Sequence, residues 1–267
     1  MPEDRSYEIP YPSSRQFTFD VGKLGREKHH IKALLEVDVT EARRKIKQSR
    51  QAGRKISVTT WLIKVLADSV ALHPLIAGVN RPRQNTVVVF DDVDISLVIE
   101  KEVNGTRVPL PYVIRKADQK TLDHIREEIE TAKLQVFEDE GNYVLGNRHN
   151  PLAMKLFLRL PQWLRLAFMR VFVCNNPQRL KHMMGNVMLT TVGMVGHGRG
   201  WIMPYSIHPL CLAISSLNEQ PALYRGEIQQ REMLHVTVLI DHDVIDGMPA
   251  ARFVNDFARR LEDGYGL

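Results

Sequence analysis

Cysteine is scarce in this chain, which has only Cys174 and Cys211 among its 267 residues. So few cysteines, placed so far apart, exclude a disulfide-stapled scaffold, and we expect both to be reduced residues of the core. The N-terminal sequence MPEDRSYEIPYPSSR is polar and rich in proline, so we expect no signal peptide. The sequence therefore predicts a cytoplasmic protein.

Long apolar runs and an excess of one charge are absent as well. The longest stretch almost free of charged residues, 200–220, contains Glu219, Pro204, His208 and Pro209, which makes it a poor membrane span. Lys and Arg number 36 against 31 Asp and Glu, and no basic stripe is concentrated enough to indicate nucleic-acid binding. The mild net charge of +5 suits a coenzyme phosphate without requiring one.

What the chain does contain is a mixture of strand-like and helix-like segments, without repeats or a dividing linker. Apolar, β-branched runs predict strands at 33–39, 86–90, 93–99, 108–114, 187–192, 210–215 and 233–240. Apolar residues at helical spacing predict helices at 41–53, from Val58 to Pro74, at 121–137 and at 249–262. We expect Thr40, Thr59 or Thr60, and Thr121 to cap the first three helices.

These strands do not alternate strictly with helices. The pattern therefore predicts an α+β fold in which helices cover one face of a large mixed sheet. We expect one domain over residues 1–267, preceded by a polar arm at residues 1–15.

Residues 151–173, PLAMKLFLRLPQWLRLAFMRVFV, interleave basic and apolar side chains. Two interpretations fit this segment. A helical hairpin packed on the core or on another subunit is favoured, because buried amphipathic helices are common. A helix lying on a membrane surface is the alternative.

The densest group of reactive side chains is Asp241-His242-Asp243-Val244-Ile245-Asp246-Gly247. If the preceding strand continues, His242 extends its inward-facing apolar side and serves as a general base near Asp246. A metal site at these residues is a second interpretation. It is weakened because neighbouring strand residues point to opposite faces. A buried structural histidine is the third.

The wider segment DHDVIDGMPAARFVNDF resembles the active-site segment of the 2-oxoacid dehydrogenase acyltransferase (E2) catalytic domains, whose signature is Asp-His-Arg-x-x-Asp-Gly. That family shares its fold with chloramphenicol acetyltransferase. Further segments resemble the family in the same order along the chain: 36–40, 55–59 with the helix to Pro74, 93–96, 108–115 and 185–196. The resemblance implies that fold and a trimer with active sites between subunits.

The resemblance also implies roles for three residues. His242 matches the catalytic histidine, a general base that helps a thiol attack an acyl thioester. Asp246 matches the motif aspartate, which organises the site. Thr190 matches a Ser/Thr that donates a hydrogen bond to the oxyanion. A plain strand residue is the alternative interpretation of Thr190, since threonine favours strands.

Departures from the family pattern shape the functional prediction. Asp243 stands where the family has arginine, and Gly22, Gly25 and the pair His29-His30 interrupt the region of its first helix. Arg15 is a candidate for pairing with Asp246, as an arginine does in related acyltransferases. Residues 138–184, which include the apolar-basic helices, resemble an insertion that forms a lid or substrate wall.

We therefore expect a stand-alone acyltransferase that uses coenzyme A as a substrate, with no metal, no nucleic acid and no covalent lipoyl group on this chain. The acceptor is expected to be a lipoyl-bearing carrier in trans or a small molecule. A non-catalytic E2-like trimeric scaffold that binds partners is the alternative function.

Overall fold

The structure is a computed structural model that describes the chain apart from residues 1–5, 9–13, 104–105, 135–155 and 192–197. Part of the expected insertion, residues 138–155, lies outside the described residues, as do residues 192–196 of the segment 185–196 that resembles the family. Helix α1, Ser14–Gly25, begins inside the predicted arm at residues 1–15.

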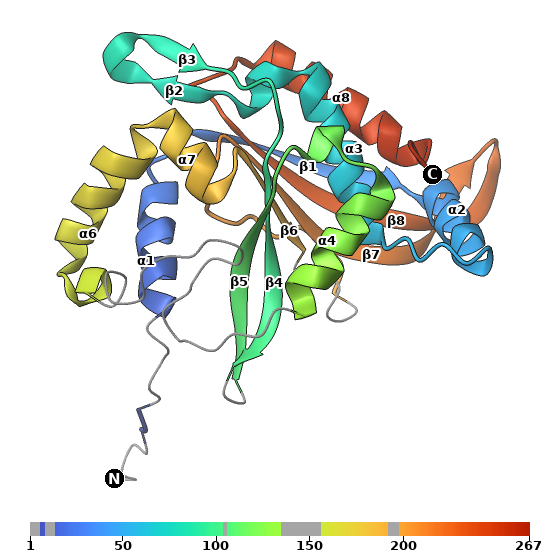
Figure 1. Ribbon diagram of the computed structural model, residues 1–267. Coiled ribbons are helices and arrows are strands. Elements are labelled where there is room, and N and C mark those ends of the chain that lie inside the picture. Colours follow the sequence, from blue (N-terminus) through green and yellow to red (C-terminus); the bar gives the residue numbers. More distant parts are fainter. Residues whose placement is uncertain (1–5, 9–13, 104–105, 135–155, 192–197) are drawn as a thin grey trace, which may run out of the picture.

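A six-stranded mixed sheet forms the centre of the molecule (Figure 1). Its order is β1-β8-β7-β6-β4-β5. The strands are β1 His30–Asp38, β4 Ile95–Val103, β5 Thr106–Ile114, β6 Val187–Thr191, β7 Leu210–Tyr224 and β8 Glu227–Asp241. Strand β6 runs parallel to β4 and β7, and the other pairs are antiparallel. Strands β2, Val79–Arg81, and β3, Thr86–Val88, form a separate two-stranded sheet.

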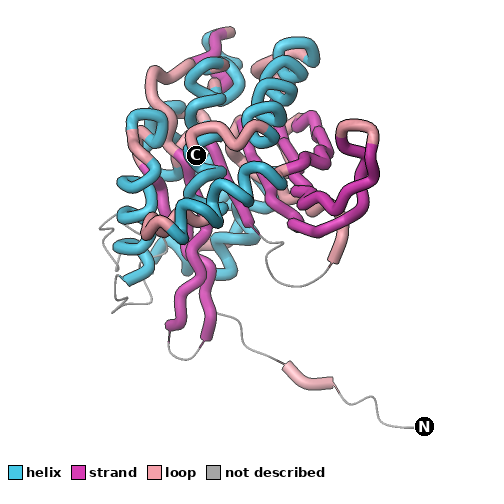
Figure 2. The backbone as a smooth tube through the Cα atoms, turned by 90° about the vertical axis from the view of Figure 1, so that its right-hand side faces the viewer, coloured by secondary structure: helices cyan, strands magenta, loops and turns pink. Residues whose placement is uncertain are grey.

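Strands β7 and β8 are each 15 residues long, more than twice the six residues predicted for the first of them. Their turn consists of Arg225 and Gly226, with φ of 52° and 86°. Positive φ at both central residues matches the twist of a two-residue hairpin. The distal half was missed because its residues are polar and partly exposed, so no apolar alternation marks them. Figure 2 shows the other hairpin, β4–β5, extending from the body of the molecule.

Helices cover one face of the sheet, as predicted. These are α2 Thr40–Gln51, α3 Val58–Leu72, α4 Leu122–Leu134 and α8 Gly247–Glu262. They enclose the main core with the inward residues of the strands, and Trp61, Phe253 and Phe257 are completely buried there. Full burial of an aromatic side chain of this size contributes roughly 2–3 kcal/mol.

Two predicted helix caps were wrong by one to three residues. Thr40 is the first residue of α2, and its hydroxyl donates to Asp38 Oδ1 at 2.6 Å instead of capping the helix. Ser57 caps α3 by accepting the N–H of Thr60 at 3.0 Å. The N-cap residue of α2 is Val39, which makes no side-chain capping hydrogen bond, so only α3 has a side-chain cap of the expected kind.

A second group of helices forms its own small core beside the sheet. It comprises α1, α6 Gln162–Phe168, the π-helical segment η4 Met169–Cys174, and α7 Pro177–Met184. Leu24, Leu166, Met169 and Val173 pack in this second core. The predicted packing of the apolar-basic segment on the protein is therefore confirmed for one face of α6.

The structure also bears on the expectations for the two cysteines and for a membrane-spanning segment. Cys174 and Cys211 are both free thiols, and burial raises the pKa of Cys211 to about 12. None of the helices in the described part of the chain is both long enough and apolar enough to span a membrane.

Candidate active site

His242 lies in a turn between strand β8 and helix α8, not on the strand as predicted. Strand β8 ends at Asp241, which is buried, while the next residue is exposed. The backbone N–H of His242 donates to the carbonyl oxygen of His29 at 3.0 Å, and Val244 N donates back to Asp241 O at 3.1 Å. The inward alternation therefore stops one residue before His242, and its imidazole faces solvent.

Asp246 occupies the N-cap position of helix α8, with φ −80° and ψ 169°. Its carbonyl accepts the N–H of Ala250 at 3.2 Å, whereas its carboxylate makes no capping hydrogen bond. Asp246 is exposed, and its carboxylate lies at the positive end of the helix dipole without a capping hydrogen bond. His242 and Asp246 thus flank one short turn.

Residues 28–29, just before β1, hold this turn through three contacts. Lys28 Nζ lies 2.6 Å from Asp241 Oδ2, and Asp241 is only 1% exposed. His29 Nδ1 lies 2.9 Å from Asp243 Oδ1, and its backbone carbonyl accepts from His242 as described above. The hydrogen bond to the Asp243 carboxylate and its charge raise the pKa of His29.

Sequence reasoning had treated His29 only as an interruption of a helix. One signal in the sequence could have indicated its role: both His29 and Asp243 depart from the family pattern, and a histidine and an acid can form a pair.

Behind the turn lies a buried polar chain that supports β1. His30 Nε2 donates to the carbonyl oxygen of His208 at 3.0 Å, and His208 Nε2 donates to Met184 O at 2.9 Å. Ser206 Oγ lies 3.1 Å from the other ring nitrogen of His208. Complete burial lowers the pKa of His208 to about 4, so this imidazole is neutral at pH 7 and acts as a fixed structural donor.

Thr190 lies on β6, half-buried and far from the turn within the same chain. It stands level with Ala213 of β7, which is level with Thr237 of β8. Leu189 is part of the main core, so Thr190 points to the face opposite the helices. His242 follows Thr237 by five residues. The strand rise then separates Thr190 from His242 by about 17 Å along the sheet, and two strand spacings add about 10 Å across it.

Arg15, the candidate partner of Asp246, is exposed on the first turn of helix α1. The two residues form no ion pair with each other in the described part of this chain. The sequence-based pairing therefore has no counterpart within a single chain.

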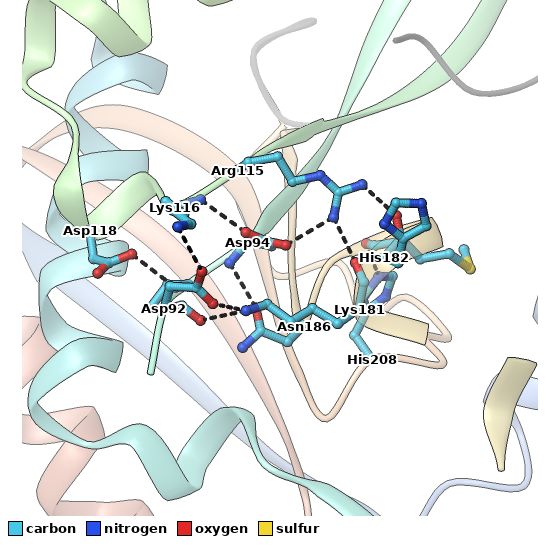
Figure 3. A network of polar contacts seen from close by, with 11 residues as sticks. Asp92, Asp94, Arg115, Lys116, Asp118, Lys181, His182, Asn186 and His208 are labelled. Atoms are coloured by element: carbon cyan, nitrogen blue, oxygen red, sulfur yellow. Dashed lines mark hydrogen bonds and ion pairs between the residues drawn. The ribbon is translucent and has the colours of Figure 1, made fainter. Parts of the chain in front are cut away.

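A buried polar network joins strands β4, β5 and β6 to helix α7 (Figure 3). Asp94, which is 5% exposed, accepts Arg115 Nη1 at 2.9 Å and the N–H of Lys116 at 2.9 Å. Asn186 Oδ1 accepts the N–H of Asp94 at 2.8 Å, and Arg115 Nη1 also donates to Lys181 O at 2.8 Å. The network aligns the start of β6 with β4, and thereby places the strand that carries Thr190.

The metal interpretation of the acidic cluster finds no assembled ligand set. Asp241 is engaged by Lys28 and Asp243 by His29. Over the residues that the structure describes, no group of three or more His, Cys, Asp and Glu side chains is arranged to hold a metal ion.

Comparison with known proteins identifies the family of this fold and site. The model for the 2-oxoacid dehydrogenases acyltransferase catalytic domain matches residues 25–138 and 179–267. The match is thus interrupted inside the segment expected to be an insertion, and it includes His242, Asp246 and Thr190.

Curated relatives agree with this match. The chain is 25% identical over 240 residues to the dihydrolipoyllysine-residue acetyltransferase component of the pyruvate dehydrogenase complex of Bacillus subtilis, covering 88% of this chain and 45% of that protein. The corresponding component of Mycoplasma pneumoniae is 22% identical, covering 82% and 47%. The chain therefore spans about half the length of these relatives.

Solved structures show the same fold at lower identity. A probable dihydrolipoamide acetyltransferase from Listeria monocytogenes superposes with a TM-score of 0.65 at 19% identity, covering 96% of this chain and 94% of the other. Dihydrolipoamide acetyltransferase from Azotobacter vinelandii gives 0.65 at 20% identity, covering 98% and 93%. Because the family model matches well over half of its residues, the chain belongs to the 2-oxoacid dehydrogenase acyltransferase family through the catalytic domain.

Proposed function

We propose that this protein is a coenzyme-A-dependent acyltransferase that moves an acyl group between a thioester and a thiol. His242 takes the proton of the attacking thiol, and the resulting sulfur attacks the thioester carbonyl carbon. The tetrahedral oxyanion accepts a hydrogen bond from the Thr190 hydroxyl. When the intermediate collapses, the carbon–sulfur bond to the leaving thiol breaks and His242 returns the proton to that sulfur. Asp246 organises the turn.

The observation that carries this proposal is a match of spacing. The Azotobacter vinelandii structure belongs to an investigation of a serine, a histidine and an asparagine in the catalytic mechanism of that enzyme. The serine precedes that histidine by the same number of residues as Thr190 precedes His242. The asparagine follows it by the same number as Asp246 follows His242. Thr190 has a hydroxyl, as that serine does, and Asp246 has a polar side chain, as that asparagine does.

The distance between Thr190 and His242 supports a site shared by two copies of the chain. A reacting carbonyl must lie about 3 Å from both the base and the oxyanion donor. These groups are far more than that apart in one chain, so His242 of one copy meets Thr190 of its neighbour. A closed homotrimer offers three such sites related by rotation.

The acceptor in this proposal is a lipoyl group on a separate carrier or a small thiol. Coenzyme A or its acyl thioester enters as a substrate. A cytoplasmic location, where acyl-CoA is made and used, accompanies the proposal.

The direct test follows the release of free coenzyme A thiol from acetyl-CoA with dihydrolipoamide and a panel of small thiols. His242→Ala is expected to lower kcat by at least about 10³-fold, because the thiol loses its base. Thr190→Val is expected to cost about 10²-fold or more, whereas Thr190→Ser keeps the hydroxyl and most of the activity.

His124→Ala is the matched control, since His124 is exposed on α4 far from the turn. Turnover that is absent in the wild type, or unchanged in His242→Ala, contradicts the proposal and favours the alternative of a non-catalytic trimeric scaffold.

A further inference from the structure

The second group of helices presents an apolar stripe to solvent along α6 and η4, together with Leu160 just before α6. The stripe residues recur every three to four positions, which places them on one helical face. They are Leu160, Trp163, Leu164, Phe168, Val171 and Phe172, with 36%, 67%, 37%, 47%, 54% and 45% of their surface exposed. A contiguous apolar surface of this kind on a folded domain is a contact site.

The orientation of this stripe is fixed by the opposite face of the same helix. Arg165 is buried there and binds Asp20 of α1 through two hydrogen bonds, from Nε at 2.7 Å and from Nη2 at 3.1 Å. Leu166 and Met169 pack on the same side. The stripe cannot rotate inward without breaking this buried ion pair, so its exposure is built into the fold.

The charge around the stripe selects an anionic partner. The sequence has no Asp or Glu between Glu140 and Glu219. Arg159, Arg170 and Arg179 are exposed at the borders of the stripe, where Arg170 pairs with Glu27 in the turn after α1 and Arg179 lies over the ring of Phe172. An apolar helical face with Trp and Phe, bordered by arginine, is the pattern of a helix that lies in the headgroup region of a bilayer.

The stripe lies between the two parts of the chain that the family model matches, residues 25–138 and 179–267. The family model therefore does not account for it. Its presence does not depend on the proposed acyl transfer.

We propose that the α6–η4 stripe docks the protein peripherally on an anionic lipid bilayer. Trp163 and Phe172 enter the boundary between headgroups and acyl chains, and the bordering arginines face lipid phosphates.

The test is flotation of the full chain with vesicles of phosphatidylcholine alone or with one third phosphatidylglycerol. The wild type is expected to float with the anionic vesicles, and to be released by added salt. Trp163→Glu and Phe172→Glu are each expected to lower the bound fraction by about tenfold. Leu223→Glu and Ile228→Glu are matched controls, because these apolar residues are 76% and 78% exposed on the distant β7–β8 hairpin.

Several results would overturn the proposal. Absence of wild-type flotation does so, as does equal binding to phosphatidylcholine alone, or equal loss in the control variants. A change of oligomeric mass in Trp163→Glu, without wild-type flotation, assigns the stripe to a contact between copies of the chain. Quenching of wild-type tryptophan fluorescence by brominated lipids provides a reading that needs no variant, and its absence also counts against the proposal.

Discussion

At the scale of single residues, the turn that carries His242 depends on contacts made 213 and 214 positions away. Lys28 holds Asp241 and His29 holds Asp243, with both pairs within 3 Å. An acid at position 243 without His29 would leave the turn with one fewer tie to β1. The two departures from the family pattern therefore compensate each other.

The His29–Asp243 pair predicts a pH dependence with a definite sign. The pKa of His29 is raised, so the pair stabilises the folded turn fully below about 6.5, the ordinary value for histidine. That contribution is lost as the pH rises through the raised value. In Asp243→Asn, we expect NMR titration of the His29 ring to return toward about 6.5. Asp123→Asn, which changes a half-exposed acid on α4, is the control and should leave the His29 titration unchanged. An unchanged His29 titration in Asp243→Asn would show that the pair does not form.

The reactive cluster could be found from the sequence, but its setting could not. His242, Asp246 and Thr190 were identified by their resemblance to a family pattern. The inward orientation of His242 was wrong, because alternation was extended past Asp241. Strand β8 ends at Asp241, whose buried carboxylate pairs with Lys28 from near the other end of the chain. No local pattern contains that contact.

At the scale of elements, the entry into β6 depends on one glycine. Gly185 has φ 76° and ψ 175°, a region open in practice only to glycine. A Cβ at this position would lie 2.6 Å from the carbonyl oxygen of Asp94, inside the polar network of Figure 3.

We expect Gly185→Ala to lower the free energy of unfolding by about 2–4 kcal/mol in urea denaturation. Gly22→Ala is the control, because a Cβ there meets nothing within 4 Å and the residue is in a helix. That change should be neutral or stabilising by up to about 1 kcal/mol. Equal stability of the two variants would show that the entry into β6 adapts.

The attachment of α6 to α1 depends on the buried pair of Asp20 and Arg165, whose side chains are 0% and 7% exposed. Asp20→Ala leaves a buried guanidinium without its carboxylate. We expect a loss of about 3–5 kcal/mol in unfolding free energy, and faster hydrogen exchange in α6.

Asp123→Ala removes a half-exposed partner of Arg54 and should cost less than about 1 kcal/mol. A similar small cost for Asp20→Ala would mean that apolar packing alone holds α6.

Regular elements with strong apolar patterns were predictable, among them α3, α8 and the buried half of β8. The sequence did not predict the division of residues 156–184 into a buried and an exposed face. Apolar residues occur on every side of helix α6, so the spacing of its apolar residues does not indicate which side packs on the protein. The buried Arg165 decides it, and a charged residue on an apolar helix is ordinarily placed outside.

At the scale of the whole molecule, the proposed site needs two chains. Thr190→Val and His242→Ala damage different sides of the same interface. When the two variants are unfolded together and reassembled as mixed trimers, some interfaces combine an intact His242 with an intact Thr190.

Random mixing of equal amounts should restore roughly a quarter of the wild-type sites. The measurement is coenzyme A release before and after mixing, with each variant reassembled alone as the control. No recovery above those controls would place both residues in one chain's site.

The separation of Thr190 and His242 along the sheet also links activity to the amount of protein present. If the proposed shared site is correct, a newly made chain that has not met another copy holds His242 and Thr190 too far apart to act on one carbonyl, and we expect no turnover from it. Specific activity should therefore fall on dilution, around the dissociation constant of the assembly, while each chain stays folded. Quaternary structure would then serve as the on-switch of the enzyme, set by its own abundance.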